Sequence, residues 1–80
     1  MITVWIFDGP DGVERAAIKR DGVGLLTVIL PPAYSRAESL ARLADRKKAR
    51  ADRAYFTDPE IYRLAISEAK LLCEASWALR

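Results

Sequence analysis

The feature that most constrains the fold is an excess of apolar faces in a short chain. Three segments within residues 1–30 and one long segment near the C-terminus are hydrophobic on more than one side. A domain of 80 residues buries only about 60–65% of the surface that its unfolded chain exposes. We therefore expect one domain, residues 1–80, with part of its apolar surface left for another molecule to cover.

Three strands are predicted from β-branched and aromatic residues bounded by turn signals. The first turn, Asp8–Gly12, has Pro10 at a corner and Gly12 at its close. The second, Asp21-Gly22, tolerates the positive φ values of a two-residue type I′ hairpin. Pro31 and Pro32 end the last strand, because proline cannot donate to a ladder. The segments 2–7, 13–20 and 23–30 are thus predicted to form a three-stranded antiparallel meander.

Both faces of this predicted sheet are apolar when side chains are counted from the turns. One predicted face consists of Thr3, Trp5, Phe7, Ala16, Ile18, Leu25, Thr27 and Ile29. The other consists of Ile2, Val4, Ile6, Ala17, Leu26, Val28 and Leu30. Two helices joined by one connection normally pack on the same side of a small sheet. We therefore expect the face carrying Trp5, Phe7, Ile18 and Leu25 to stay open and to mediate self-association or partner binding.

Two helices are predicted after the strands, which gives an α+β fold of the order βββαα. Ser35 and Glu38 fit a capping box that starts a helix running to about Tyr55. Either Thr57 or Asp58 can cap a second helix, with Pro59 in its first turn, that runs nearly to Arg80.

The second predicted helix is apolar around most of its circumference, which suits a helix held between the sheet and a neighbour. Its narrow polar strip consists of Arg63, Ser67, Lys70 and Glu74. Glu68 falls inside the apolar stripe. It is interpreted as an edge residue, as the ion-pair partner of a base on the first helix, or as a specificity contact at an interface. Cys73 lies on the same stripe and is predicted to be a packed, unreactive thiol.

The first predicted helix has a small-residue face and a basic face. Ala37, Leu40, Ala44, Ala51 and Tyr55 share the face expected to pack. Arg42, Arg46, Arg50 and Arg53 line the opposite, solvent-exposed side. Residues 40–53 carry six basic and two acidic side chains in a chain of net charge +2, so the basicity is local.

Several kinds of chemistry lack their usual residues. There is no histidine, and the single cysteine offers no zinc spacing. Gly12, Gly22 and Gly24 lie in or beside hairpin turns and are not followed by a phosphate-loop lysine. Asp8 and Asp11 are typical of a turn next to glycine. The sequence thus favours a protein that is not an enzyme and has no cofactor, metal site or catalytic residues.

The N-terminal segment has no basic region, and it reaches an acid and a turn too early for a signal peptide or a membrane span. One cysteine agrees with a reducing compartment. We expect a cytoplasmic protein that does not contact membranes.

Two functions compete on these residues. In the first, Trp5, Phe7 and the row Arg42, Arg46, Arg50 and Arg53 bind a larger protein or complex and block it, with a homodimer as a compatible assembly. In the second, the arginine row binds the phosphate backbone of DNA, as in a small regulator. The segment Leu26–Pro32 followed by two helices resembles a ribbon-helix-helix repressor, but it offers only Thr27 to read bases and lacks a short glycine turn between the helices.

In size and type the chain is similar to the small phage-encoded inhibitors of bacterial defence, the anti-CRISPR proteins in particular. This resemblance rests on a short βββαα chain without a catalytic set. It implies stoichiometric binding to a Cas protein or surveillance complex in the cytoplasm of an infected host. Many such inhibitors are acidic DNA mimics, whereas this chain has a net charge of +2, so its target patch is expected to be acidic or apolar.

Overall fold

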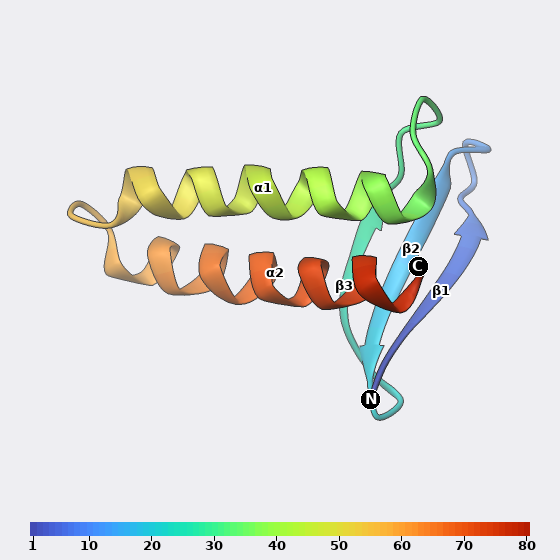
Figure 1. Cartoon of the computed structure of the whole chain (residues 1–80), viewed down its shortest axis with the longest axis horizontal. Coiled ribbons are helices and arrows are strands. Elements are labelled where there is room, and N and C mark those ends of the chain that lie inside the picture. Colours follow the sequence, from blue (N-terminus) through green and yellow to red (C-terminus); the bar gives the residue numbers. More distant parts are fainter.

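The computed structural model describes residues 1–80 and has the predicted order of elements. The strands β1, β2 and β3 form one antiparallel sheet in the order β1-β2-β3, and α1 and α2 form a hairpin that packs on one side of it (Figure 1). The elements are β1 (Ile2–Asp8), β2 (Glu14–Arg20), β3 (Val23–Ile29), α1 (Arg36–Ala54) and α2 (Pro59–Ala78). The α+β fold of three strands followed by two helices is confirmed.

Both hairpin turns form where the sequence predicts them. Asp21 and Gly22 have φ values of 51° and 83°, as a type I′ turn requires. In the first loop, Gly12 has a φ of 77°, and the Asp11 carboxylate accepts a hydrogen bond from the Val13 N–H at 3.1 Å. Asp11 therefore serves the turn that its position beside glycine predicts.

The register of β2 differs from the prediction. Ile18 pairs with Val4 on one side and with Leu26 on the other, so it lies on the face that the helices cover. The type I′ turn pairs Arg20 with Val23 as expected, but the ladder slips after Lys19 and leaves Leu25 as an extra residue on β3. The regular β1–β2 ladder thus places Ala16 and Ile18 on the inner face and Ala17 on the outer one, which corrects the predicted faces. The β-bulge keeps Leu26 and Val28 of β3 on the inner face beside them.

The helices begin at the predicted caps. The Ser35 hydroxyl accepts a hydrogen bond from the Glu38 N–H at 3.2 Å, but the Glu38 carboxylate bonds to Arg42 instead of returning to the cap, so the predicted capping box forms only in part. Asp58, not Thr57, caps α2 and accepts from the Ile61 N–H at 3.2 Å.

The main core lies between the inner face of the sheet and the adjacent halves of the two helices. Its three fully buried large side chains are Ile18, Leu40 and Leu72, and small residues such as Ala44 and Ala75 let the helices approach closely. The helices are 19 and 20 residues long, against 7 for each strand, and their connected ends extend well past the sheet (Figure 1). Nothing else packs against this overhanging end.

The overhang explains one further correction. Leu40, Ala44 and Ala51 are buried as predicted, but Tyr55 at the end of α1 is 55% exposed. Tyr55 lies at the tip of the hairpin, where no sheet faces it. Ala54 closes the contact between the helices there instead.

Candidate functional site

The outer face of the sheet is open, because both helices lie on the other side. Trp5 is 62% exposed and Phe7 is 38% exposed on this face. Ile29 of β3, which pairs with Arg15 and is 55% exposed, joins them. Ile18, which was expected in this group, is fully buried on the inner face. The open apolar face is thus present, with Trp5 and Phe7 on it as predicted. Leu25 is the bulged residue and instead lines a groove with Leu64 of α2.

The central strand β2 supplies the two basic residues of the outer face, Arg15 and Lys19. Ala17 pairs with Trp5, and Lys19 pairs with Thr3. The Lys19 ammonium lies 4.8 Å from the centre of the Trp5 ring, a cation–π contact, and has no ion pair. We define the outer sheet face as the side chains of Thr3, Trp5, Phe7, Arg15, Ala17, Lys19, Thr27 and Ile29.

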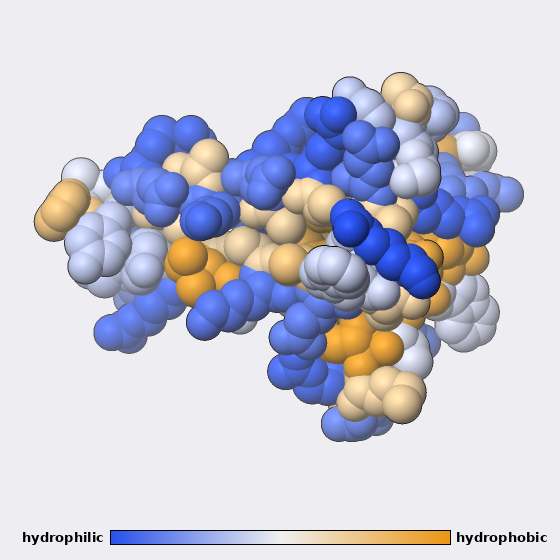
Figure 2. Space-filling model, viewed as in Figure 1, coloured by the Kyte–Doolittle hydropathy of each residue, from blue (hydrophilic) through white to orange (hydrophobic).

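The arginine row is exposed along its whole length, as predicted, but its members differ in what they contact. Arg42 is held by the Glu38 carboxylate at 3.2 Å and stacks over the Tyr34 ring at 4.0 Å. Arg46, Arg50 and Arg53 have no ion pair. Figure 2, which views the helix side, shows hydrophilic side chains along α1 and a pale apolar strip between the helices.

The arginine row and the outer sheet face do not form one surface. Residues 46–53 belong to the half of α1 that extends past the sheet, whereas Trp5 and Phe7 lie on the side of the sheet turned away from both helices (Figure 1). A single small contact cannot include both. The predicted site residues therefore divide into two surfaces.

Glu68 forms the ion pair that was one of its predicted roles. Its carboxylate lies 3.4 Å from the Lys47 ammonium of α1, and both side chains are more than two-thirds buried. This pair links the helices near the start of the overhang. The predicted polar strip of α2, Arg63, Ser67, Lys70 and Glu74, is exposed along its length.

Two exposed aromatic groups on the helices were not among the predicted sites. Phe56 is 93% exposed at the tip of the hairpin, where the Tyr55 ring meets it edge-on at 4.7 Å. Trp77 is 67% exposed near the end of α2, with the Arg80 guanidinium over its ring at 4.9 Å. The sequence signal for Phe56 was the presence of an aromatic residue in the turn between the two helices. Trp77 gave no separate signal, because the second predicted helix is apolar around most of its circumference.

Cys73 is exposed, which corrects its predicted packing. It borders a shallow groove between the helices, beside Ala44, Ile66 and Ala69, on the side of α2 that the sheet does not reach. Helix α1 alone is too narrow to cover this side of α2.

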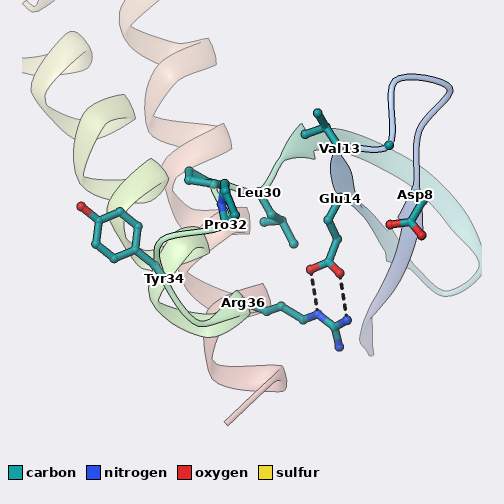
Figure 3. A pocket seen from close by; sticks show the side chains of 9 residues that line it. Asp8, Val13, Glu14, Leu30, Pro32, Tyr34 and Arg36 are labelled. Atoms are coloured by element: carbon teal, nitrogen blue, oxygen red, sulfur yellow. Dashed lines mark hydrogen bonds and ion pairs between the residues drawn. The ribbon is translucent and has the colours of Figure 1, made fainter.

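A pocket of about 440 Å³ lies between the first hairpin loop and the segment that leads into α1 (Figure 3). The Arg36 guanidinium bonds both oxygens of the Glu14 carboxylate there, at 2.9 and 3.0 Å. The hydrogen bonds from Arg36 lower the pKa of Glu14. Leu30, Pro32 and Tyr34 supply its apolar wall, and Asp8 lies across from the ion pair. The charges of Glu14 and Arg36 thus neutralise each other, and their ion pair links the start of β2 to the start of α1.

The structure brings together no cluster of three or more histidine, cysteine or acidic residues that could hold a metal ion. Neither helix is long and apolar enough to span a bilayer. Comparisons of the chain with protein-family models, with curated proteins and with solved structures found no match.

Proposed function

We propose that the protein is a non-enzymatic binding module whose outer sheet face docks against a larger protein and inhibits it. The observation that carries this proposal is the open outer sheet face. Burial of a large apolar side chain contributes about 1.5–3 kcal/mol, and Trp and Arg dominate the binding energy of many interfaces. Trp5 and Phe7 project from a paired strand, so little conformational freedom remains to be lost on binding.

The target class we propose is a bacterial defence complex, namely a Cas protein or surveillance complex. The size and type of the chain support this class. The surfaces described above suit an apolar target patch with acidic groups, because the outer sheet face carries the unpaired cation Lys19 and no acid among its eight residues. An inhibitor of this kind acts by occupying the patch and not by turnover.

The test is a titration of the protein against a panel of purified Cas nucleases and surveillance complexes, with target DNA binding and cleavage as readouts. Inhibition of a susceptible complex should saturate at a fixed molar ratio. Trp5→Ala should abolish most of it, whereas Trp77→Ala, which removes a similarly exposed tryptophan from α2, should retain it. Complete inhibition far below one molecule per target, or equal loss in both variants, would contradict the proposal.

A second candidate function is DNA binding by Arg46, Arg50 and Arg53. The observation that favours it is that these three side chains are exposed and have no ion pair, so they are free to contact phosphates. Retention of the parent protein on duplex DNA that decreases steeply with salt would support this function.

A further inference from the structure

Strand β1 is an unprotected edge of the sheet. The strand order β1-β2-β3 leaves its outer side unpaired, and no other element lies beyond it in Figure 1. Its seven residues include no proline, glycine, lysine or arginine, and its pairing with β2 is regular throughout. Natural sheets usually protect such an edge with a bulge, a proline or a basic residue. The other edge, β3, has this protection in the bulge at Leu25 and in Gly24 beside it.

The hydrogen bonds of the sheet identify the backbone groups that face this edge. The Asp21 N–H donates to the Met1 carbonyl at 3.2 Å, and the Gly9 N–H donates to the Val13 carbonyl at 2.9 Å. Successive residues of a strand turn their N–H and C=O groups to opposite sides, so the odd-numbered residues of β1 face β2. The N–H and C=O groups of Ile2, Val4, Ile6 and Asp8 therefore point outward along the free edge.

The charges near the two ends of β1 are opposite. Asp8 at one end has no ion pair within the chain. At the other end, Ile2 pairs with Arg20 of β2, whose guanidinium also bonds the Glu74 carboxylate of α2 at 3.0 Å. A second β1 in antiparallel orientation, centred on Trp5, places its Asp8 opposite Ile2, in the same row and on the same face as Arg20. The twofold axis repeats this complementarity, whereas a parallel arrangement would set Asp8 beside its own copy.

We propose that β1 pairs with β1 of a second copy of this chain in antiparallel orientation, joining two sheets into one of six strands. In the centred register, Val4 exchanges backbone hydrogen bonds with Ile6 of the second copy. Trp5 meets its symmetry mate in a non-hydrogen-bonded pair, with the Cα atoms about 4.5 Å apart. The two outer sheet faces then adjoin, so that their aromatic residues form one larger surface. This assembly goes beyond the proposed inhibition and does not depend on it.

The test removes a single outward N–H without changing any side chain. The chain is prepared by chemical synthesis with N-methylvaline at Val4, and in a control with N-methylthreonine at Thr27. The Leu30 N–H donates to the Glu14 carbonyl of β2, so the even-numbered residues at this end of β3 turn their backbone groups towards β2. The N–H of Thr27 therefore points to the free edge of β3. Sedimentation over a wide concentration range should show dimers for the parent and for the Thr27 form, and monomers for the Val4 form. A parent that stays monomeric, or a dimer that N-methylation at Val4 does not weaken, overturns the proposal.

A second measurement tests the register and does not require the N-methylated chain to fold. In a Cys73→Ser background, Trp5→Cys should form a disulfide between two chains under mild oxidation, because a central non-hydrogen-bonded pair lies within disulfide range. Thr27→Cys on the other edge is the matched control. Efficient cross-linking of Trp5→Cys alone supports the proposal, whereas equal or absent cross-linking in the two variants contradicts it.

Discussion

At the scale of single residues, two buried serines on the facing helices differ in whether their hydroxyl groups have a hydrogen-bond partner. Ser39 and Ser76 are only 1% and 2% exposed. The Ser76 hydroxyl donates a hydrogen bond to the Ala37 carbonyl at 2.9 Å, which ties α2 to the first turn of α1. The Ser39 hydroxyl has no partner. An unpaired buried hydroxyl lowers stability, whereas a paired one contributes to it.

We predict that replacing each serine by alanine changes stability in opposite directions. Ser39→Ala should leave the free energy of unfolding unchanged or raise it by about 1 kcal/mol, because it removes a polar group that is buried without a partner. Ser76→Ala should lower it by about 1–2 kcal/mol, because the Ala37 carbonyl loses its donor. Urea unfolding followed by circular dichroism measures both. The prediction is wrong if Ser39→Ala destabilises the protein as much as Ser76→Ala does.

The pKa of Asp11 is shifted further from its ordinary value than that of any other acid in the chain. The hydrogen bond from the Arg15 side chain, aided by the Val13 N–H, lowers the pKa of Asp11 from 3.8 to about 2. Because the pKa is lower in the folded state, the stabilisation is fully present above about pH 4 and is lost as the pH falls towards about 2. The bond between Asp11 and Arg15 should therefore weaken at the acid end of this range.

We predict that Arg15→Gln returns the pKa of Asp11 towards 3.8, as measured by an NMR titration of its carboxyl carbon. Gly9→Ala should raise this pKa too, since a Cβ at Gly9 would collide with the Arg15 guanidinium and displace it. Arg20→Gln is the control, because Arg20 bonds to Glu74 on α2 and not to this loop. An Asp11 pKa that stays near 2 in Arg15→Gln would show that the backbone N–H groups suffice.

At the scale of elements, the bulge in β3 decides which residues of β3 face the core beside Ile18. Without the bulge, the ladder that starts at the type I′ turn would place Leu25 opposite Ile18, so Leu25 and Thr27 would lie on the inner face. The extra residue at Leu25 brings Ile18 opposite Leu26 instead, between Val4 and the helices. The gain is that Leu26 and Val28, instead of Leu25 and Thr27, pack against the core beside the fully buried Ile18.

We predict that aspartate at two neighbouring positions of β2 has opposite consequences. Ile18→Asp should prevent folding, because it places an unpaired charge in a fully buried position. Ala17→Asp should fold, because Ala17 lies on the outer sheet face beside Trp5, where water and Lys19 can accommodate a carboxylate. Circular dichroism and thermal unfolding distinguish the two. A folded Ile18→Asp together with an unfolded Ala17→Asp would restore the faces expected from the turns.

At the scale of the whole molecule, the helices and the sheet differ in length, and this difference creates two separate surfaces. The overhanging hairpin carries Arg46, Arg50, Arg53 and the exposed Phe56, whereas the sheet carries Trp5 and Phe7. A partner that binds one surface leaves the other free. Variants of the two surfaces can therefore be analysed independently.

We predict that replacing Arg42, Arg46, Arg50 and Arg53 together by Glu leaves the protein folded, because all four side chains are exposed. Stability should decrease modestly, mainly through the loss of the Arg42 contacts with Glu38 and Tyr34. If the row binds DNA, the variant should lose salt-sensitive retention on a duplex. If the row assists protein binding, association with the target should slow instead. Unchanged behaviour in both assays would leave the row as a solvated helix face.

The sequence by itself determined the order of the elements, both turns and the two helix caps. These features depend on residues close together in the chain, such as Asp21 with Gly22 or Ser35 with Glu38, so local chemistry is sufficient to specify them. It also determined that one sheet face carries exposed aromatic residues, because Trp5 and Phe7 alternate with the residues that pack inward.

Only the tertiary structure decided the register of β2, the exposure of Tyr55 and Cys73, and the separation of the arginine row from the sheet. The β1–β2 ladder turns Ile18 towards the helices, and the bulge at Leu25 turns Leu26 and Val28 the same way. Both arrangements bury apolar side chains against the helices, which a local turn rule does not take into account. The exposure of Tyr55 and Cys73 depends on what faces each side of a helix, and two long helices on a short sheet leave several sides uncovered. Periodicity identifies an apolar stripe, but the relative lengths and placement of the elements determine how much of it is buried.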